Sequence, residues 1–528
     1  MLKLTRKYYD TLRHLKWVQI KYRLIYKLKS ADKLVTVSKD MIAKKNRLSL
    51  QASITGNRSW LSDNTFEFLN IKHQFKDSID WNYRAYGKLW TYNLTYFDFL
   101  EQEHISKKEG LVFMHDFIHQ LPLVKDGMEP FPISLRCNNW IKFLIRHQID
   151  DPKIDTSLYQ QLVVLNKKTE YHLLGNHLLE NGFSLLFGAC YFNDPALLTT
   201  AKKIITTQLN EQILPDGAHF ELSPMYHQIM LFRVLDTINL LSNNKQISEE
   251  KLTALLIEKA STMLGWLQQM AFKNGELPQV NDSVKGIAPA HSQLLNYAQQ
   301  LNIQPKLTPL KECGYRMIRK TNYETLVDVG QIGPDYIPGH AHSDTLNFIL
   351  HHQGQPLIVD TAISTYEKNK QRTQERSTAA HNTVRIGEVE QSEVWGGFRV
   401  ARRAKVIDLS ETPNRISAAH DGYQKINCKH LRTFVFHENS MEIEDKVTGN
   451  KEAKAFLHFH PNMPPTLDGA LISGSFGTIH FVGQKQIHIE PYTLAIGFNK
   501  TLEALKAVIV FRDELMTKII LDENFISN

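Results

Sequence analysis

The spacing of apolar residues divides the chain into a helical half and a β half. From about residue 109 to about 300, apolar residues recur at intervals of three and four, the spacing of one face of an α-helix. The polar segments between these stretches are short, so neighbouring helices are expected to pack as antiparallel pairs. Seven stretches carry this pattern: VFMHDFIHQL, NNWIKFLIRHQI, LYQQLVVLNKK, NHLLENGFSLLFGACYF, ALLTTAKKIITTQL, MYHQIMLFRVLDTINLLS and KLTALLIEKASTMLGWLQQMAF.

After about residue 310 the apolar period falls to two, and Gly, Asn and Pro separate short alternating segments such as RTFVFHE, SMEIEDKV and KAVIVFRD. This pattern is typical of an antiparallel β-sandwich. We therefore predict an α+β multidomain fold. The expected parts are a basic N-terminal helix with a capping segment over 1–108, a helical domain over 109–308 and a β-sandwich domain over 309–528.

The first thirty residues, MLKLTRKYYDTLRHLKWVQIKYRLIYKLKS, contain no Gly or Pro and place Leu12, Leu15, Ile20, Leu24 and Leu28 among Lys and Arg residues. This segment predicts a basic amphipathic helix. Either the helix docks on its own domain with a solvated charged face, or it attaches peripherally to an anionic membrane or an acidic polymer.

Composition and charge narrow the class of protein. A chain of 528 residues exceeds what one core usually organises, so more than one domain is expected. Residues 1–50 hold fourteen basic and three acidic residues, a charge of +11, and the total of +7 leaves the other 478 residues at −4. A nucleic-acid partner is therefore not expected, because such binding needs a basic folded face. The four cysteines are scattered, so we predict buried thiols and no disulfide framework.

No stretch of the sequence is typical of a cleavable signal peptide or a membrane span. We therefore expect a cytoplasmic or inner-membrane-associated protein, with the cell envelope or periplasm as the alternative. The sequence does not indicate an oligomeric state.

Two candidate clusters lie in the helical half. In Asn176-His177-Leu178-Leu179-Glu180, a spacing of three places His177 and Glu180 on one helix face. In DGAHFELSPMYHQ, a polar and aromatic loop ends at Pro224, a residue suited to the first turn of a helix, so Tyr226 is expected at that helix's start. Such a tyrosine can transfer a proton if neighbouring cations lower its pKa. Structural hydrogen bonding and aromatic packing are the alternatives.

Two further clusters lie in the β half. His340 and His342 in GHAHSDTLNF would point to one side of an extended segment. Asp360 and His381 each stand at the end of an apolar β-type run. Two histidines and an aspartate from three strands, with water as the fourth ligand, would make a tetrahedral zinc site, and a hydrogen-bonded cluster is the alternative.

These clusters, in this order, resemble the heparinase II/III family of bacterial, alginate-lyase-like polysaccharide lyases. The resemblance covers roughly residues 80 to 460 and implies an N-terminal incomplete α/α toroid followed by an antiparallel β-sandwich, with the substrate between them. The motifs that carry it are NHLLENGFSLLF, DGAHFELSPMYH, GHAHSDTLNF, VDTAISTYE and RSTAAHNTVRIGEVEQSEVWGGFRVARRAKV.

The resemblance also implies a role for each residue. Asn176, His177 and Glu180 match the group that neutralises a uronate carboxylate, and Tyr226 and His340 match the catalytic tyrosine and histidine. A second set matches the ligands of a structural Zn²⁺: His342, Asp360 and His381. The implied reaction is β-elimination, in which a bond between oxygen and C4 of a uronate breaks and a 4,5-unsaturated end forms.

Other functions remain open at this point. A glycoside hydrolase would use Asp216 and Glu221 as its carboxylate pair. A non-catalytic carbohydrate-binding protein would use Trp90, Trp140 and Trp395 as stacking platforms. For a lyase we expect an acidic polysaccharide substrate, namely a uronate-containing bacterial exopolysaccharide or capsular glycan in preference to heparin.

Overall fold

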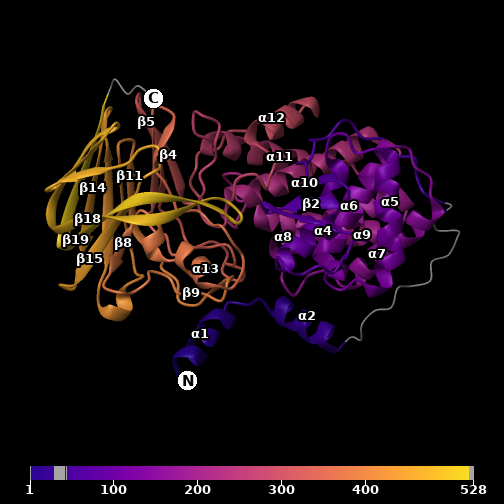
Figure 1. Ribbon diagram of the computed structural model, residues 1–528, viewed down its shortest axis with the longest axis horizontal. Helices are drawn as coiled ribbons and strands as arrows, with labels where there is room; N and C mark the ends of the chain where they lie inside the picture. The colour runs from indigo at the N-terminus through magenta and orange to yellow at the C-terminus, as the bar shows by residue number, and fades with distance from the viewer. Residues whose placement is uncertain (1, 29–41, 43, 523–528) are drawn as a thin grey trace.

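The computed structural model describes residues 2–28, 42 and 44–522, and it places a helical part beside a β part (Figure 1). Each part has its own large hydrophobic core, one built mainly from helices and the other from two sheets. The predicted fold class, an incomplete α/α toroid followed by an antiparallel β-sandwich, is confirmed.

The helices of the toroid follow the seven predicted stretches closely. Asp151, Asp194 and Ser223 cap three of them, each followed directly by a proline in the first turn. The helices are α5 (Lys107–Gln120), α6 (Pro130–Arg146), α7 (Pro152–Lys167), α8 (Gly175–Phe192), α9 (Pro195–Gln212), α10 (Pro224–Asn243), α11 (Glu250–Met270) and α12 (His291–Gln300).

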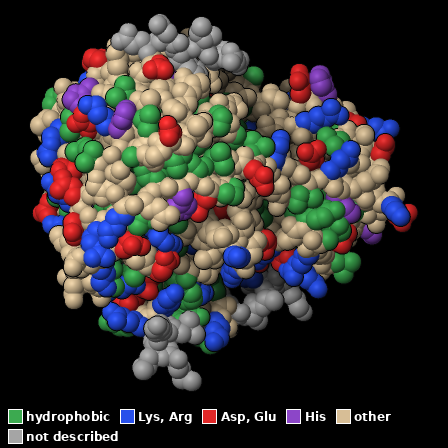
Figure 2. Space-filling view, turned by 60° about the vertical axis from the view of Figure 1, so that its left-hand side comes forward, with side chains coloured by type: hydrophobic (Ala, Val, Ile, Leu, Met, Phe, Trp, Pro, Cys, Tyr) green, Lys and Arg blue, Asp and Glu red, His purple; other side chains and the backbone are tan. Residues whose placement is uncertain are grey.

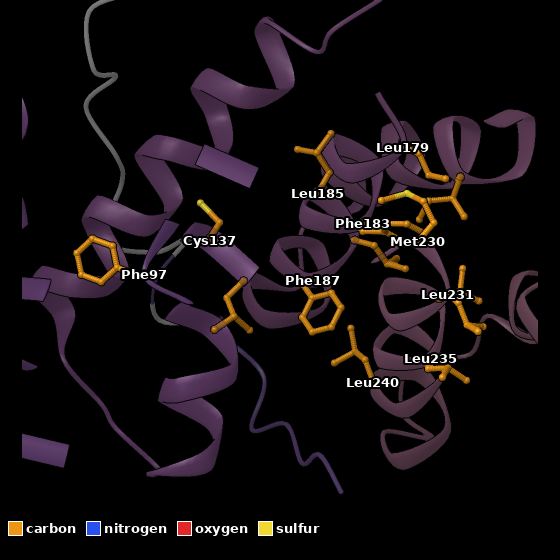
Figure 3. Packing of buried hydrophobic residues seen from close by; sticks show 14 of the residues in the cluster. Phe97, Cys137, Leu179, Phe183, Leu185, Phe187, Met230, Leu231, Leu235 and Leu240 are labelled. Carbon is orange, nitrogen blue, oxygen red and sulfur yellow. The ribbon is translucent and has the colours of Figure 1, made fainter. Parts of the chain in front are cut away.

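Helix α8 lies at the centre of the toroid, and nearly all of its side chains are buried. Leu179 and Phe183 of α8 lie close to Met230 of α10 in the core, with Phe187 further along the same helix (Figure 3). Burial of both apolar faces fixes α8 and α10 against each other. The N-terminal ends of these two helices carry the candidate residues of the helical half.

The segment before α5 forms a three-stranded sheet and a helix that pack into the core of the toroid. Trp90 of α4 and Trp140 of α6 are both 0% exposed. They cannot act as sugar-stacking platforms, which corrects that part of the carbohydrate-binding alternative. The elements are β1 (Trp60–Ser62), β2 (Thr65–Phe68), β3 (Ile71–Gln74) and α4 (Lys88–Tyr96).

The β part is a sandwich whose two sheets bury one shared core. Val327 and Phe348 of the smaller sheet and Phe434 and Ile509 of the larger sheet belong to the same cluster. The smaller sheet has the order β4 (Tyr315–Arg319), β5 (Tyr323–Asp328), β6 (Phe348–His352) and β7 (Gln355–Ile358). The larger sheet has the order β11 (Val406–Thr412), β12 (Arg415–His420), β13 (His430–Phe436), β14 (Ser440–Val447), β19 (Lys500–Leu521), β18 (Gly477–Gly497), β17 (Leu471–Gly474) and β16 (Thr466–Asp468).

Four more strands and one helix complete the described β part. Strand β15 (Glu452–His458) joins the larger sheet through β19 and also pairs with β8 (Val384–Ile386). A separate hairpin consists of β9 (Val394–Trp395) and β10 (Arg399–Val400). Helix α13 (Lys370–Glu375) lies close to this hairpin (Figure 1).

The N-terminal segment forms two helices, α1 (Leu2–Leu12) and α2 (Trp17–Leu28), and not the single helix predicted. A turn at residues 13–14 separates them, and each lies against a different part of the protein (Figure 1). Tyr8 packs edge-on against Trp395 of the β part, and Tyr22 stacks on Tyr171 of the helical part at 4.8 Å. One face of the segment therefore docks on its own domains. Among the described residues, no helix has the length and apolar content needed to cross a membrane.

Candidate active site

The candidate residues gather where the toroid meets the sandwich. A small apolar cluster joins Met225 of α10 and Val284 after α11 to Ile363 and Phe498 of the β part. Tyr226 and Tyr366 pack against the same cluster. Residues that are far apart in the sequence are thereby held in one place by apolar contacts from both halves.

Asp282 is the centre of the polar network at this junction. Its side chain is fully buried, and its carboxylate accepts hydrogen bonds from His340 Nδ1 at 2.9 Å, His342 Nε2 at 2.9 Å and both terminal nitrogens of Arg372 at 2.5 and 2.7 Å. Burial by itself would raise the pKa of Asp282, but Arg372, His340 and His342 outweigh burial and hold that pKa well below its ordinary value.

His340 and His342 do approach one group, as predicted, but not because they lie on a strand. Residues 337–347 are irregular and form no strand. The two rings meet because both donate to Asp282, and the backbone N–H of Asp282 in turn donates to the carbonyl of His340 at 3.1 Å. The positions of the two histidine rings are therefore set by the buried carboxylate of Asp282 and not by the two-residue repeat of a β-strand.

Tyr226 lies beside His340 at the start of α10, where the Ser223 cap accepts its backbone N–H at 3.4 Å. The Tyr226 and His340 rings are 4.0 Å apart between centroids, and the Tyr226 hydroxyl is 3.2 Å from the hydroxyl of Tyr366. The predicted tyrosine and histidine are therefore direct neighbours.

The neighbouring cations do not lower the pKa of Tyr226. Burial is the largest cause and raises the pKa of Tyr226, and the nearby charges of Asp282 and Glu221 raise it further. The hydrogen bond with Tyr366 and the charge of Arg372 act in the opposite direction but do not outweigh these effects. Tyr226 is therefore protonated at neutral pH, a form suited to donating a proton.

Asn176 joins this network through Glu221. Its side-chain amide donates to both oxygens of the Glu221 carboxylate, at 3.1 and 2.8 Å, and its backbone N–H donates to one of them at 3.1 Å. One of these two oxygens, Oε2, also lies 3.5 Å from His340 Nε2. A continuous series of contacts therefore runs from Asn176 through Glu221 and His340 to Tyr226.

His177 lies next to this network and carries a partly exposed ring. Its Nδ1 is 3.1 Å from Glu170 Oε1, and its ring packs against Phe131 at 4.5 Å. Burial lowers the pKa of His177, but Glu170, aided by Glu221 and Glu180, outweighs burial and raises it. His177 is thus the candidate that best carries a positive charge toward an anionic ligand.

Glu180 does not join His177 and Asn176 in one hydrogen-bonded group. Its carboxylate is 0% exposed and forms an ion pair with Arg233 of α10, with Oε1 2.9 Å from Nε. Burial raises the pKa of Glu180, and Arg233 partly offsets this effect. His177 and Glu180 lie on one helix, as predicted. Glu180, however, is the more deeply buried of the two, and its ion pair with Arg233 links α8 to α10.

The three predicted zinc ligands are buried close together. His381 Nδ1 is 2.8 Å from Asp360 Oδ2, and the His342 and His381 rings are 5.3 Å apart. His342 Nδ1 and His381 Nε2 are buried without a hydrogen-bond partner. Burial lowers the pKa of His342 to about 4, so its ring is neutral at pH 7, the form that binds a metal.

These orphaned nitrogens and the carboxylate are a donor set that zinc accepts. In the part of the chain that the structure describes, however, no three His, Cys, Asp or Glu side chains are gathered into a group that could hold a metal ion. Zinc at His342, Asp360 and His381 therefore stays a prediction.

The carboxylate pair of the hydrolase alternative does not converge. Asp216 is buried and accepts backbone N–H groups from Cys313 at 2.8 Å, Lys311 at 3.1 Å and Ala218 at 3.3 Å. These bonds attach the loop before α10 to the segment that leads into β4. Asp216 thus has a structural role and is not the carboxylate partner that Glu221 would need for hydrolysis.

Sequence reasoning missed Asp282, Arg372 and Tyr366. Tyr366 lies inside VDTAISTYE, a motif that was considered for Asp360 alone. Asp282 and Arg372 lie in NDS and KQRTQER, which carry no recognisable spacing, because their partners come from other segments of the chain. A buried ion pair of this kind is visible only in three dimensions.

Comparisons with known proteins agree with the fold and with the order of the two parts of the chain. A family model described as "Heparinase II/III N-terminus" matches residues 139–311, and one described as "Heparinase II/III-like, C-terminal" matches residues 302–519. The heparin-sulfate lyase of Bacteroides stercoris is 23% identical over 350 residues, which are 59% of this chain and 50% of that protein. The chain thus spans about half the length of this curated relative.

Solved structures share the architecture at low sequence identity. A crystal structure of heparinase III is similar with a TM-score of 0.68 and 13% identity, covering 96% of this chain and 89% of that chain. Heparan sulfate lyase HepC from Pedobacter heparinus is similar with a TM-score of 0.55 and 16% identity, covering 96% and 88%. At these identities the likeness supports the fold alone.

The pairing of Glu180 with Arg233 generates a stability prediction. Arg233→Met leaves a buried carboxylate without its cation, so we expect the free energy of unfolding to fall by about 3–5 kcal/mol. The double variant Arg233→Met/Glu180→Leu removes both charges and should recover most of that loss. Denaturant unfolding measures both variants, with the exposed Arg58→Met as control. A single variant as stable as the parent would contradict the account.

Proposed function

The chain belongs to the heparinase II/III family, and from this membership and the site geometry we propose that it is a polysaccharide lyase. It cleaves a uronic-acid-containing glycan by β-elimination and leaves a 4,5-unsaturated uronate at the new end. The observation that carries the proposal is the direct contact of Tyr226 with His340, 4.0 Å between ring centroids, on a network that reaches Asn176.

The first requirement of this reaction is neutralisation of the uronate carboxylate. The proton on C5 next to a carboxylate anion is hard to remove unless that charge is offset as the enolate-like transition state forms. His177 supplies a cationic ring, since Glu170 raises its pKa. Asn176 adds an amide whose orientation is fixed by Glu221. Glu180 contributes by positioning α8 against α10 through Arg233.

The second requirement is a base and an acid on the reacting sugar. His340 donates its Nδ1 proton to Asp282, which leaves the Nε2 lone pair available as the base that removes the C5 proton. Tyr226 is protonated because its pKa is raised, and it protonates the departing O4 oxygen. The C5–H electrons form the C4–C5 double bond as the C4–O4 bond breaks, so no water is consumed.

The proton-transfer roles generate a kinetic prediction. Tyr226→Phe and His340→Ala should each lower kcat by about 10²- to 10⁴-fold while polymer affinity changes little, because each removes a group that acts in the transition state. Turnover is followed by the ultraviolet absorbance of the unsaturated uronate, with Tyr9→Phe and His104→Ala as exposed controls. Near-full activity of Tyr226→Phe would show that the assigned acid is wrong.

We propose a bacterial capsular or exopolysaccharide uronate as the substrate, in preference to heparin. Residues 51–528 sum to −4, and on the face drawn in Figure 2 Lys and Arg side chains are interspersed with Asp and Glu. This supports a polymer of lower charge density than heparin, since a heavily sulfated chain favours a strongly basic surface. A panel of alginate, capsular polymers, heparan sulfate and heparin compares the rates, and fastest cleavage of heparin would overturn this assignment.

We also propose that His342, Asp360 and His381 hold a structural zinc ion that stabilises the sandwich beside the active site. Two buried ring nitrogens without partners and one adjacent carboxylate support this proposal. Bound there, zinc would supply folding free energy and take no part in the proton transfers.

The zinc proposal predicts a coupled loss of metal and stability. His381→Ala should lose stoichiometric zinc and lower the midpoint of thermal unfolding together, because metal binding adds to the stability of the folded state. Metal analysis and thermal unfolding measure the two effects, with His480→Ala on the surface of β18 as control. A parent protein that is purified without zinc and is indifferent to chelators would refute the site.

For location, we propose that the protein acts at the inner membrane surface, beside the assembly of the cell's own polysaccharide. Residues 2–28 hold eight basic residues and one acidic residue, a charge of +7. On α2 the side chains of Trp17 and Leu28 are 73% and 86% exposed while the opposite face is docked. Each Lys or Arg near anionic lipid contributes about 1 kcal/mol to binding.

This proposal predicts selective binding to anionic vesicles. Full-length protein should co-sediment with vesicles that contain phosphatidylglycerol and not with pure phosphatidylcholine, and Trp17→Ala/Leu28→Ala should weaken the binding several-fold. Leu123→Ala, an exposed leucine of the helical part, serves as the control. Equal sedimentation with both kinds of vesicle, or with neither, would contradict membrane attachment.

A further inference from the structure

The hairpin of β9 and β10 is anchored with its tip beside the active site. Gly396 and Gly397 form the turn with φ values of 57° and 78°, a region that favours glycine. The carbonyl oxygen of Gly397 accepts a hydrogen bond from Arg372 Nε at 3.1 Å and another from Arg376 Nη1 at 2.7 Å. Arg372 is the residue that also binds Asp282. The hairpin tip is therefore fixed to the network that holds His340.

Phe398 leaves this anchored tip and lies against the reacting pair. Its ring is 6.0 Å from the His340 ring and 5.1 Å from the Tyr366 ring, edge-on in both cases. The side chain is nevertheless 39% exposed. An exposed, rigidly held aromatic ring next to a polysaccharide site offers a face for stacking on a sugar.

Arg399, the next residue, is held by aromatic rings and has no acidic partner. Its guanidinium lies 4.8 Å from the centre of the Trp395 ring and 5.7 Å from that of Tyr8. Across residues 2–28, 42 and 44–522, no carboxylate forms an ion pair with it. The side chain is exposed, so its donors face solvent at the rim of the site.

Helix α2 presents a second arginine to the same region from the helical part. Arg23 Nε donates to the backbone carbonyl of His172 at 3.4 Å. His172 follows Glu170 by two residues, and Glu170 binds His177. Burial and then the positive charge of Arg399 lower the pKa of Arg23. No ion pair of Arg23 is found within the described residues either. The two positive charges, from different parts of the protein, thus act on each other, and no carboxylate among the described residues pairs with either, an arrangement that an anion would stabilise.

We propose that Phe398, Arg399 and Arg23 form a substrate subsite for a second acidic sugar, next to the one whose bond is cut. The Phe398 ring stacks on that sugar, and the two guanidinium groups bind its anionic group, a carboxylate or a sulfate. This inference rests on the proposed function and extends it, because it requires a polymer with acidic groups on more than one residue. It also makes the N-terminal helices part of the binding site.

Kinetics on defined polymers test the subsite. Arg399→Gln and Arg23→Gln should each raise KM about tenfold on a polyuronate, with kcat within about twofold, because the lost contact is to a sugar that does not react. Arg399→Lys should retain most of the affinity. Arg58→Gln, a change at an exposed arginine that makes none of the contacts described for the site, should leave both constants unchanged.

The choice of polymer distinguishes the two sources of negative charge. A KM effect on unsulfated polyuronate assigns the subsite to a carboxylate, and an effect confined to sulfated glycosaminoglycan assigns it to a sulfate. Unchanged KM values for the double variant Arg399→Gln/Arg23→Gln, on every polymer that the parent cleaves, would overturn the subsite.

A binding measurement separates failure of the subsite from failure of the proposed function. Calorimetric titration of the polymers into the parent protein and the double variant needs no turnover. If the parent cleaves nothing, weaker binding by the double variant still supports the subsite while the lyase assignment fails. Equal binding by both proteins, or no binding by the parent, overturns the subsite.

Discussion

The buried carboxylate of Asp282 is the constraint on which the site depends. Four hydrogen bonds from His340, His342 and Arg372 offset the cost of burying it. These partners lie 58 to 90 positions away along the chain. Asp282 lies in the loop after α11, His340 and His342 lie in the loop before β6, and Arg372 lies on α13. The hydrogen bonds to Asp282 therefore fix these three segments relative to one another. His340, the proposed base, and His342, a proposed zinc ligand, consequently share a single acceptor.

Buried carboxylates that are held by specific partners also organise the helical side of the site. Glu180, Glu221 and Glu170 are buried carboxylates, and each is committed to a partner: Arg233, Asn176 and His177. The first pairing fixes α8 against α10, and the other two orient the residues that face the substrate. With these acidic groups already paired, His177, whose pKa is raised by Glu170, and the arginines of the proposed subsite are available to an anionic polymer.

The sequence predicted the elements well and the contacts between them poorly. Apolar periodicity located α5 to α11 and most strands, because burial of one face leaves a regular pattern. It did not separate α1 from α2, since the break at residues 13–14 contains neither Gly nor Pro. The motifs singled out Tyr226 and His340 as candidates, and the structure places their rings next to each other. The motifs could not identify Asp282 or Arg372, nor show that Glu180 pairs with Arg233, because ion pairs between segments that are distant in the sequence leave no periodic pattern.

The central claim is that Tyr226 and His340 cleave the glycan by elimination, and its most direct test is the fate of the solvent's oxygen. A uronate polymer is digested in water enriched in oxygen-18, and the masses of the fragments are measured. Elimination breaks the C4–O4 bond without consuming water, so the account predicts fragments that sum to the mass of the substrate and carry no oxygen-18. Fragments that together gain one water, with oxygen-18 at the new end, would contradict it.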